Sequence, residues 1–219
     1  MIYIIDPLNE VFRLSLFTVF FGIFLDTTVG LNTLMELIKK DPKLYFKGLM
    51  ANYLNLLFLS PLYYVAAYNL LLNYEIETFN FLNYSCLTLI HGIGYYYIHK
   101  LMHVNHHFKW IHNFHHEFVI TVPSSGNAVS LYEFQFAYVL PFLVGALLLH
   151  PSPIDFKYSI FTISCFNLFI HTKELETLKF PFFLVSPNDH ITHHKTRSDT
   201  YAAPILNIDN IIKYKKNIL

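Results

Sequence analysis

The chain has 219 residues, of which 54% are hydrophobic, 18% aromatic and only 14% charged. A soluble globular chain carries about 25% charged residues, so this composition, with a mean hydropathy of +0.38, is typical of a protein built for lipid. The 15 basic and 15 acidic residues cancel to a formal net charge of zero, which gives no reason to expect nucleic-acid binding.

Five apolar segments follow one another along the chain and predict an all-α, polytopic integral membrane helical bundle. They cover about residues 8–25, 49–72, 81–98, 131–149 and 154–170. A spanning helix needs roughly 20 mainly apolar residues. The first three segments therefore qualify as spans, and the last two, a hairpin across residues 150–153, are near the lower limit. Pro61 in the second segment predicts a kink.

The basic residues predict how these segments cross the membrane. Thirteen of them lie between segments one and two, after segment three, or after segment five: Lys39, Lys40, Lys43, Lys47, Lys100, Lys109, Lys173, Lys179, Lys195, Arg197, Lys213, Lys215 and Lys216. Because lysine and arginine are enriched in cytoplasmic loops, we expect these three regions to share the cytoplasmic face. The opposite face then receives Asp6, Glu10, Glu75, Glu77 and Asp155.

Eight histidines fall into three clusters with a repeated spacing, all in the regions predicted to be cytoplasmic. His99 and His103 stand four apart, and two trios have the spacing His-x-x-His-His: His112, His115 and His116, and His190, His193 and His194. On a helix, residues i, i+3 and i+4 share one face, so we expect each trio to point its imidazoles the same way. His171, at the end of the fifth segment, is a ninth candidate.

This many imidazoles predicts a histidine-rich di-metal cap on the cytoplasmic side. Neutral imidazole is the commonest metal ligand, and one zinc ion needs about four ligands. Eight or nine histidines suit two octahedral ions that each keep a position for oxygen or water. The competing interpretation, interfacial polar residues that bind metal adventitiously, requires the same register to arise twice by chance.

Other polar residues near the clusters receive weaker assignments. His106 and His107 fall off the spacing and are interpreted as loop residues or as residues that support the metal ligands, and His91 as a helix histidine or a proton-path residue. Glu117 and Asp189 are candidates to orient imidazoles, with a solvated carboxylate as the alternative. The aromatic run 95–97 could line a lipid entrance or form an interfacial belt, and segments two to five are expected to form the substrate pocket.

The histidine pattern resembles the fatty acid hydroxylase superfamily, membrane proteins that include sterol desaturases and alkylglycerol monooxygenase. Over roughly residues 95–212 the motifs read YYYIHKLMH, WIHNFHHEF, FIHTKELETLKFPFFLVSPNDHITHH and YAAPILNID. Two positions depart from the usual pattern, Thr200 in place of asparagine and Ile208 in place of tryptophan, and the usual following Gly-Thr is absent.

The resemblance implies a di-iron oxidoreductase, with two iron ions that activate O2 for hydroxylation or desaturation of a lipid. The lipid would be a sterol, fatty acyl, sphingoid or ether lipid, and electrons would come from cytochrome b5 or a reductase. In a eukaryotic host the endoplasmic reticulum membrane is expected. Residues 1–80 would form N-terminal transmembrane helices and residues 81–219 the catalytic domain. The metal ligands would be His99, His103, His112, His115, His116, His171, His190, His193 and His194.

Two alternatives stay open at this stage. The first is a metal-dependent membrane hydrolase, in which a metal-bound water attacks the substrate and Glu117 acts as general base. The second is a degenerate, non-catalytic relative that binds lipid or metal, suggested by the altered C-terminal motif.

Overall fold

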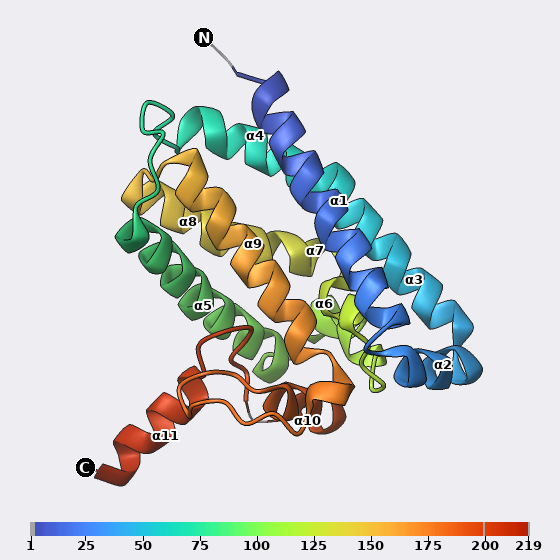
Figure 1. Cartoon of the computed structure of the whole chain (residues 1–219). Helices are drawn as coiled ribbons and strands as arrows, with labels where there is room; N and C mark the ends of the chain where they lie inside the picture. Colours follow the sequence, from blue (N-terminus) through green and yellow to red (C-terminus); the bar gives the residue numbers. More distant parts are fainter. Residues whose placement is uncertain (1–2, 199, 219) are drawn as a thin grey trace.

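Long antiparallel helices form the body of the molecule, and shorter helices gather at one end of it (Figure 1). The computed structural model describes residues 3–198 and 200–218. The long elements are α1 (Ile5–Thr27), the continuous run of α3 (Pro42–Tyr53), η1 (Leu54–Leu59) and α4 (Ser60–Leu70), α5 (Phe81–Val104), the run of α7 (Leu131–Glu133), η4 (Phe134–Val139) and α8 (Leu140–Leu149), and α9 (Pro153–Ile170). Each corresponds to one predicted apolar segment. The described residues contain no strand, so the predicted all-α bundle is confirmed.

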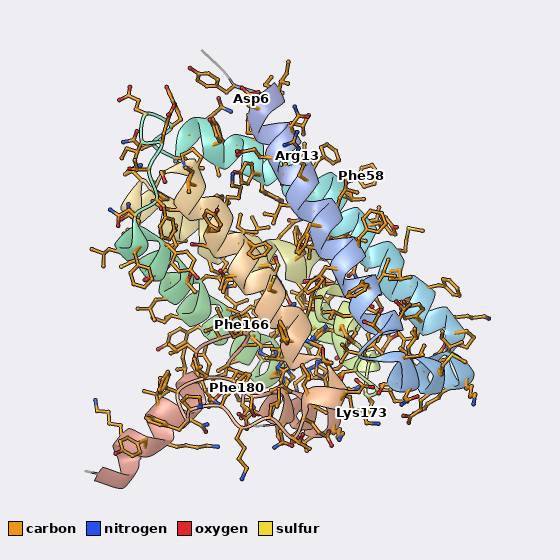
Figure 2. The ribbon with its side chains drawn as sticks, in the orientation of Figure 1. Asp6, Arg13, Phe58, Phe166, Lys173 and Phe180 are labelled. Carbon is orange, nitrogen blue, oxygen red and sulfur yellow. The ribbon has the colours of Figure 1, made fainter. Side chains whose placement is uncertain are left out.

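The shorter helices lie at the end where α1, α5 and α9 finish and where α3 and α7 begin (Figure 1). They are α2 (Leu31–Lys40), α6 (Lys109–His112), η2 (His115–Glu117), η3 (Pro123–Asn127), η5 (Lys173–Leu175), α10 (Pro187–Thr196) and α11 (Ile208–Ile218). All loops with the thirteen clustered basic residues therefore emerge at this end, and Figure 2 shows Lys173 here and Asp6 near the opposite end.

Three helices are long and apolar enough to cross a membrane: Ile5–Thr27, Pro42–Leu70 and Leu131–Leu149. Their outward faces carry large apolar side chains, such as Phe20, Phe58 and Leu62, each at least 60% exposed. Figure 2 shows Phe58 on one of these faces. Such a surface is stable in a bilayer, where helices satisfy all their backbone hydrogen bonds internally.

The choice of spans differs in part from the sequence-based expectation. The third predicted segment, α5, is not among the helices that are apolar enough to cross a membrane, whereas residues 131–149 are. The reason is that α5 carries histidines, tyrosines and asparagine, and α9 likewise carries Asp155 and Asn167. Both helices pack against several neighbours within the bundle, where protein can satisfy polar side chains that lipid cannot.

Two π-helical turns precede prolines in the long helices. Proline has no backbone N–H and clashes with the carbonyl one turn earlier, and a widened turn is one way a helix accommodates this. Just before Pro61, Ser60 donates to the Asn55 carbonyl, five residues back, and before Pro141, Leu140 donates to the Gln135 carbonyl. The predicted disturbance at Pro61 therefore takes the form of a π turn in a continuous helix.

Buried polar side chains of the first helices hold η3 against the bundle. The Asp26 carboxylate accepts hydrogen bonds from the Ser124 backbone N–H (2.9 Å) and the Tyr45 hydroxyl (3.0 Å). Asn52 donates to the Ser124 carbonyl (2.9 Å), and Asn55 donates to the Val129 carbonyl (2.9 Å). These contacts fix the backbone of residues 124–129, which lies directly beside the histidines.

Candidate metal centre

Nine histidines converge where α5, α6, η2, the end of α9 and α10 meet. They form two groups, and within each group the ligand-capable atoms all lie within 4.8 Å of one another. Group one contains His99, His103, His112, His116 and His193, and group two contains His115, His171, His190 and His194. The structure thus brings together all nine histidines selected from the sequence, and their role as metal ligands is taken up as a proposal below.

The two groups are adjacent because each histidine trio contributes to both. In the first trio His112 and His116 belong to group one and His115 to group two, while in the second His190 and His194 belong to group two and His193 to group one. Across the boundary, the ring centroids of His116 and His194 are 4.8 Å apart.

The expectation that each trio points one way from a helix was only partly right. The second trio does lie on one helix, α10, but the first is divided between a single turn of α-helix, α6, and the 3-10 turn η2. The break places His112 on a different turn from His115 and His116.

The Nε2 atoms face the centre of each group. In group one the Nε2 atom of His99 lies 2.8 Å from that of His112 and 3.2 Å from that of His103. In group two the Nε2 atom of His171 lies 2.9 Å from that of His190 and 3.2 Å from that of His194.

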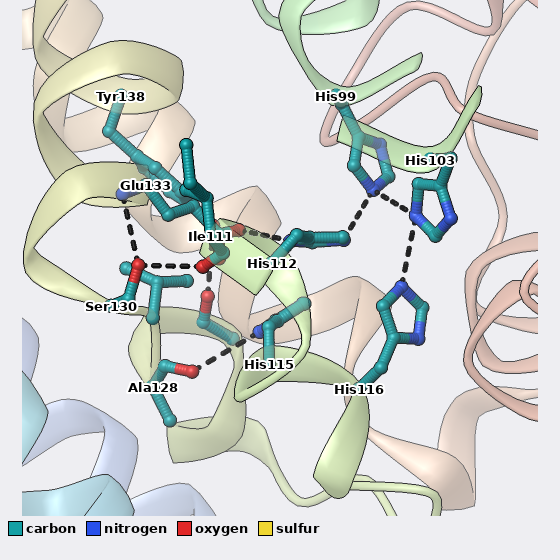
Figure 3. A network of polar contacts seen from close by, with 12 residues as sticks. His99, His103, Ile111, His112, His115, His116, Ala128, Ser130, Glu133 and Tyr138 are labelled. Carbon is teal, nitrogen blue, oxygen red and sulfur yellow. Dashed lines mark hydrogen bonds and ion pairs between the residues drawn. The ribbon is translucent and has the colours of Figure 1, made fainter. Parts of the chain in front are cut away.

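Several Nδ1 atoms point outward to oxygen acceptors. The Nδ1–H groups of His99 and His171 donate to the carbonyls of Tyr201 and Asn167, both at 2.7 Å. His115 donates to the Ala128 carbonyl (3.3 Å), the contact drawn in Figure 3. A carbonyl only accepts, so Nδ1 carries the proton and the lone pair of each ring lies on Nε2, facing inward.

This arrangement fits a bound cation. Two Nε2 lone pairs that face each other at about 3 Å have no hydrogen between them, so the inward-facing atoms repel unless a positive ion lies among them. A metal-ligating histidine typically donates its other N–H to a carbonyl or carboxylate, as His99, His115 and His171 do. The donor set of five and four imidazoles is therefore suited to two metal ions.

Burial keeps these imidazoles in the neutral form that binds metal. Desolvation, reinforced by neighbouring histidines, lowers the pKa of His112, His190 and His194 well below its usual value. Desolvation also lowers the pKa of His171 to about 4. These rings are consequently uncharged near pH 7, with lone pairs available for coordination.

Glu133 is a site residue that the sequence reasoning missed. Its fully buried carboxylate accepts a hydrogen bond from His112 Nδ1 at 2.6 Å (Figure 3). Ser130 caps the helix start by accepting from the Glu133 N–H (3.1 Å) and donates to the Ile111 carbonyl (2.6 Å). The signal that could have found it is the Ser-x-x-Glu sequence that opens an apolar segment, where a carboxylate has no evident role in lipid.

The two carboxylates proposed to orient imidazoles do not contact any histidine ring. Glu117 is half-exposed and pairs with Lys47 at 3.4 Å. Asp189 caps α10 by accepting from the Ser186 N–H, and it also accepts from Asn207, both at 3.2 Å. A charged carboxylate is more stable in these solvated or hydrogen-bonded positions, so the solvated-carboxylate interpretation holds for Glu117.

The remaining histidines lie outside both groups. His106 and His107 are exposed, in agreement with a loop assignment, and the His150 Nδ1–H donates to the Leu71 carbonyl (3.1 Å) at the opposite end of the bundle. His91 is fully buried two turns before His99 and packs on Phe142 at 4.2 Å between ring centroids.

The aromatic run 95–97 does not form one surface. All three tyrosines lie on α5. Tyr95 and Tyr96 are buried in the core, and Tyr97 is 65% exposed. Successive residues of a helix point about 100° apart, so the three rings cannot line one entrance. Tyr95 instead lies between His99 (5.2 Å) and Tyr138 (5.4 Å), measured between ring centroids.

The C-terminal segment closes over the site despite its unusual sequence. The Tyr201 carbonyl holds His99, and Asp209 accepts from the Ala202 N–H at 2.9 Å. Arg197 donates to the His116 carbonyl at 3.2 Å. The contacts that position the histidines are thus made by residues next to Thr200 and Ile208, not by those two side chains.

We predict that Gly126→Ala destabilises the protein and displaces His171. A Cβ atom at residue 126 would lie 2.8 Å from the Asn167 carbonyl oxygen and 2.9 Å from His171 Nδ1. Overpacking of this kind costs about 1–3 kcal/mol. Thermal unfolding of the detergent-solubilised protein should show a lower midpoint. The matched control is Gly92→Ala, where the nearest atom is 3.9 Å away; an equal loss in both variants would contradict the close packing at Gly126.

Comparison with known proteins connects this site to a family. The fatty acid hydroxylase family matches residues 84–213, a range that contains all nine histidines. A protein named fatty acid hydroxylase ahd1, from Mycosarcoma maydis, is 30% identical over 131 residues, which is 60% of this chain and 32% of the relative. The chain thus matches about a third of that relative's length. No solved structure matches. The family resemblance inferred from the histidine motifs is confirmed, and the chain belongs to the fatty acid hydroxylase family.

Proposed function

We propose that this protein is a di-iron membrane oxidoreductase that hydroxylates or desaturates a lipid with O2. The observation that carries the proposal is the division of nine imidazoles into adjacent groups of five and four, with Nε2 atoms facing inward. When bound, iron supplies the one-electron and oxygen chemistry that side chains alone cannot perform. His99, His103, His112, His116 and His193 would hold one ion and His115, His171, His190 and His194 the other.

The chain's own residues supply position and exclusion of water. Backbone carbonyls of Tyr201, Ala128 and Asn167 fix three of the rings through Nδ1, and Glu133 fixes a fourth. Eight of the nine histidines are buried and the ninth, His103, is half-buried. A dry, rigid site of this kind favours oxidation of the substrate over side reactions with water.

The setting of the reaction is also part of the proposal. The family assignment supports a lipid substrate, and the relative's name refers to a fatty acid hydroxylase. We infer that the histidine end faces the cytoplasm, because the clustered basic residues lie at that end. Electrons would then come from cytochrome b5 or a reductase in the same compartment, and in a eukaryotic host the membrane would be that of the endoplasmic reticulum.

The hydrolase alternative is less well supported by the site. A metal-dependent hydrolase needs a general base within reach of the attacking water. Glu117, the base considered for that role, pairs with Lys47 near the surface, and the buried Glu133 is engaged by the outer nitrogen of His112. Neither carboxylate faces the Nε2 side of the histidines.

The decisive experiment uses the iron-loaded protein in lipid vesicles with an added electron donor, under 18O2 or under argon. A hydroxylase should form an 18O-labelled lipid under 18O2, a desaturase should form an unsaturated lipid, and neither product should form under argon. Cleavage of the lipid by water under argon would favour the hydrolase. A metal-loaded protein that consumes no oxygen with lipid extracts would favour the non-catalytic relative.

A further inference from the structure

An elongated, mostly apolar cavity lies inside the bundle between α1, η1–α4, η4–α8 and α9. Its volume is about 90 Å³, and it is partly open to the surroundings. On α9 its lining runs from Phe156 to Asn167, a helical rise of about 16 Å. The pocket predicted from segments two to five is thus built with segment one in place of segment three.

The two ends of the cavity differ in polarity. The cavity floor is formed by Asn127, Tyr138 and Asn167, and the far end by Val11, Tyr64 and Phe156. Tyr138 and Asn167 both donate to the Gly126 carbonyl, at 3.0 and 2.7 Å. At the far end the Tyr64 hydroxyl donates to Glu10 (3.0 Å), which leaves its ring to line the cavity.

The cavity floor is in direct contact with the residues that hold the histidines. Asn167 is both a floor residue and, through its carbonyl, the partner of His171 Nδ1. Asn127 immediately precedes Ala128, the partner of His115. The Tyr138 ring packs on Tyr95, which in turn packs on His99. The end of the cavity nearest the histidines is therefore its polar end.

The cavity is partly open, and two of the described helices in its wall are not in close contact. α1 packs on α4 and α9, and α5 packs on α8 and α9, but in the described chain α4 and α8 are not closely packed on each other. The lining residues that face this gap, Tyr63 on α4 and Leu143 on α8, are half-buried, in contrast to the buried Tyr64 and Phe142 beside them. A hydrocarbon chain could enter sideways from the bilayer.

We propose that this cavity holds one unbranched hydrocarbon chain of the lipid, with its tail at the far end and its polar end at the cavity floor. The polar end is then the end nearer to the histidines, and on the proposed function we expect oxidation nearer to the polar end of the substrate than to its tail. The polarity of the two ends dictates this orientation, since burying a polar group among apolar side chains without a partner is unfavourable. The assignment of an oxidised carbon rests on the proposed function, whereas the binding orientation does not.

Photo-crosslinking tests the orientation without requiring turnover. The iron-loaded protein in lipid nanodiscs is labelled with palmitic acid that carries a diazirine either at the chain end or beside the carboxyl group. The chain-end probe should label peptides that contain Val11, Tyr64 or Phe156, and the carboxyl-side probe should label those with Asn127, Tyr138 or Asn167. The reverse pattern, or labelling confined to the outward faces of the helices, would overturn the proposal.

Neighbouring substitutions on α8 provide a matched control. Leu143 lines the cavity, whereas Val144 beside it is 41% exposed. Leu143→Trp should reduce far-end labelling by about tenfold, the factor expected when about two methylene groups leave the cavity, and Val144→Trp should not. Should Leu143→Trp fail to fold, Ile160→Phe on α9 tests the same space.

Competition and turnover separate the possible failures. Unlabelled palmitic acid should suppress the labelling, and cholesterol should not; suppression by cholesterol alone would overturn the single-chain assignment. Oriented labelling without any oxygen-dependent product would contradict the proposed function and leave the cavity assignment intact. Oxygen-dependent product formation with no labelling of the cavity would support the proposed function and overturn the cavity assignment.

Discussion

His193→Ala and His115→Ala are each expected to lose about one of two bound metal ions and nearly all lipid oxidation. The two residues belong to different groups, so each variant removes a donor from one ion and leaves the donor set of the other complete. Loss even of a residue that only orients a ligand typically costs 10–100-fold in metal affinity or activity. We therefore expect activity to fall by at least about a hundredfold when a ligand itself is lost. Metal content per chain by mass spectrometry, together with product formation, checks this.

A matched control separates this effect from general loss of histidine. His106 is exposed and lies outside both groups, so His106→Ala should keep the metal content and activity of the unmodified protein. Full metal content in both His193→Ala and His115→Ala would refute the ligand assignment. The double variant should bind almost no metal, because both groups are then incomplete.

The histidine pattern in the sequence was informative because metal sites need several donors in a fixed spacing. The spacing of three clusters selected eight of the nine residues that the structure brings together, and the place of His171 at the end of an apolar segment added the ninth. It could not show that each trio divides between two groups, because that depends on how the turns are placed in three dimensions: the first trio is interrupted after His112, whereas the second divides on one continuous helix. Helix ends are set by local capping and tertiary contacts that periodicity does not encode.

The residues that surround the histidines were harder to predict. Glu133 is separated from His112 by 21 positions and reaches it because α7 packs on α6. The partners of His99, His115 and His171 are backbone carbonyls, which any residue type provides. The sequence therefore carries no side-chain signal for these partners.

The membrane segments show a similar division. Apolar composition located all five long elements, but it placed α5 among the spans and the wall of the cavity among segments two to five. Apolarity reports how much polar surface a helix carries, not which neighbours cover it. In the structure the helices that carry the site, α5 and α9, are the more polar ones because protein surrounds them, and α1 takes the place of α5 in the cavity wall.

Glu133→Ala is expected to weaken metal binding by group one by about 10–100-fold, the usual cost of removing a residue that orients a metal-bound histidine. The substitution removes the acceptor of the His112 N–H, so the ring loses the contact that fixes its orientation and its tautomer. It also leaves a buried N–H without a partner, which itself costs about 1–3 kcal/mol. Iron affinity measured by competition with a chelator, in parallel with activity, checks the prediction.

Glu133→Gln distinguishes the geometric from the electrostatic contribution. Of the buried carboxylates that the structure describes, Asp26, Glu133 and Asp155, Glu133 is the one that contacts a histidine. Nine neutral imidazoles cannot offset the charge of two metal ions. Among these buried carboxylates, Glu133 is the one in contact with a histidine, and it can therefore supply negative charge next to the metal site. Glutamine keeps an acceptor oxygen and removes the charge.

We therefore expect Glu133→Gln to bind iron more weakly than the unmodified protein and more tightly than Glu133→Ala. Glu117→Gln, at the surface, is the matched control and should leave the affinity unchanged. If Glu133→Gln equals the unmodified protein, the carboxylate acts through geometry alone; if all three variants bind iron normally, Glu133 has no part in holding the metal. A buried carboxylate bonded to the outer nitrogen of a ligand is costly unless a nearby cation balances it, and that cost is the physical reason for expecting the charge to matter.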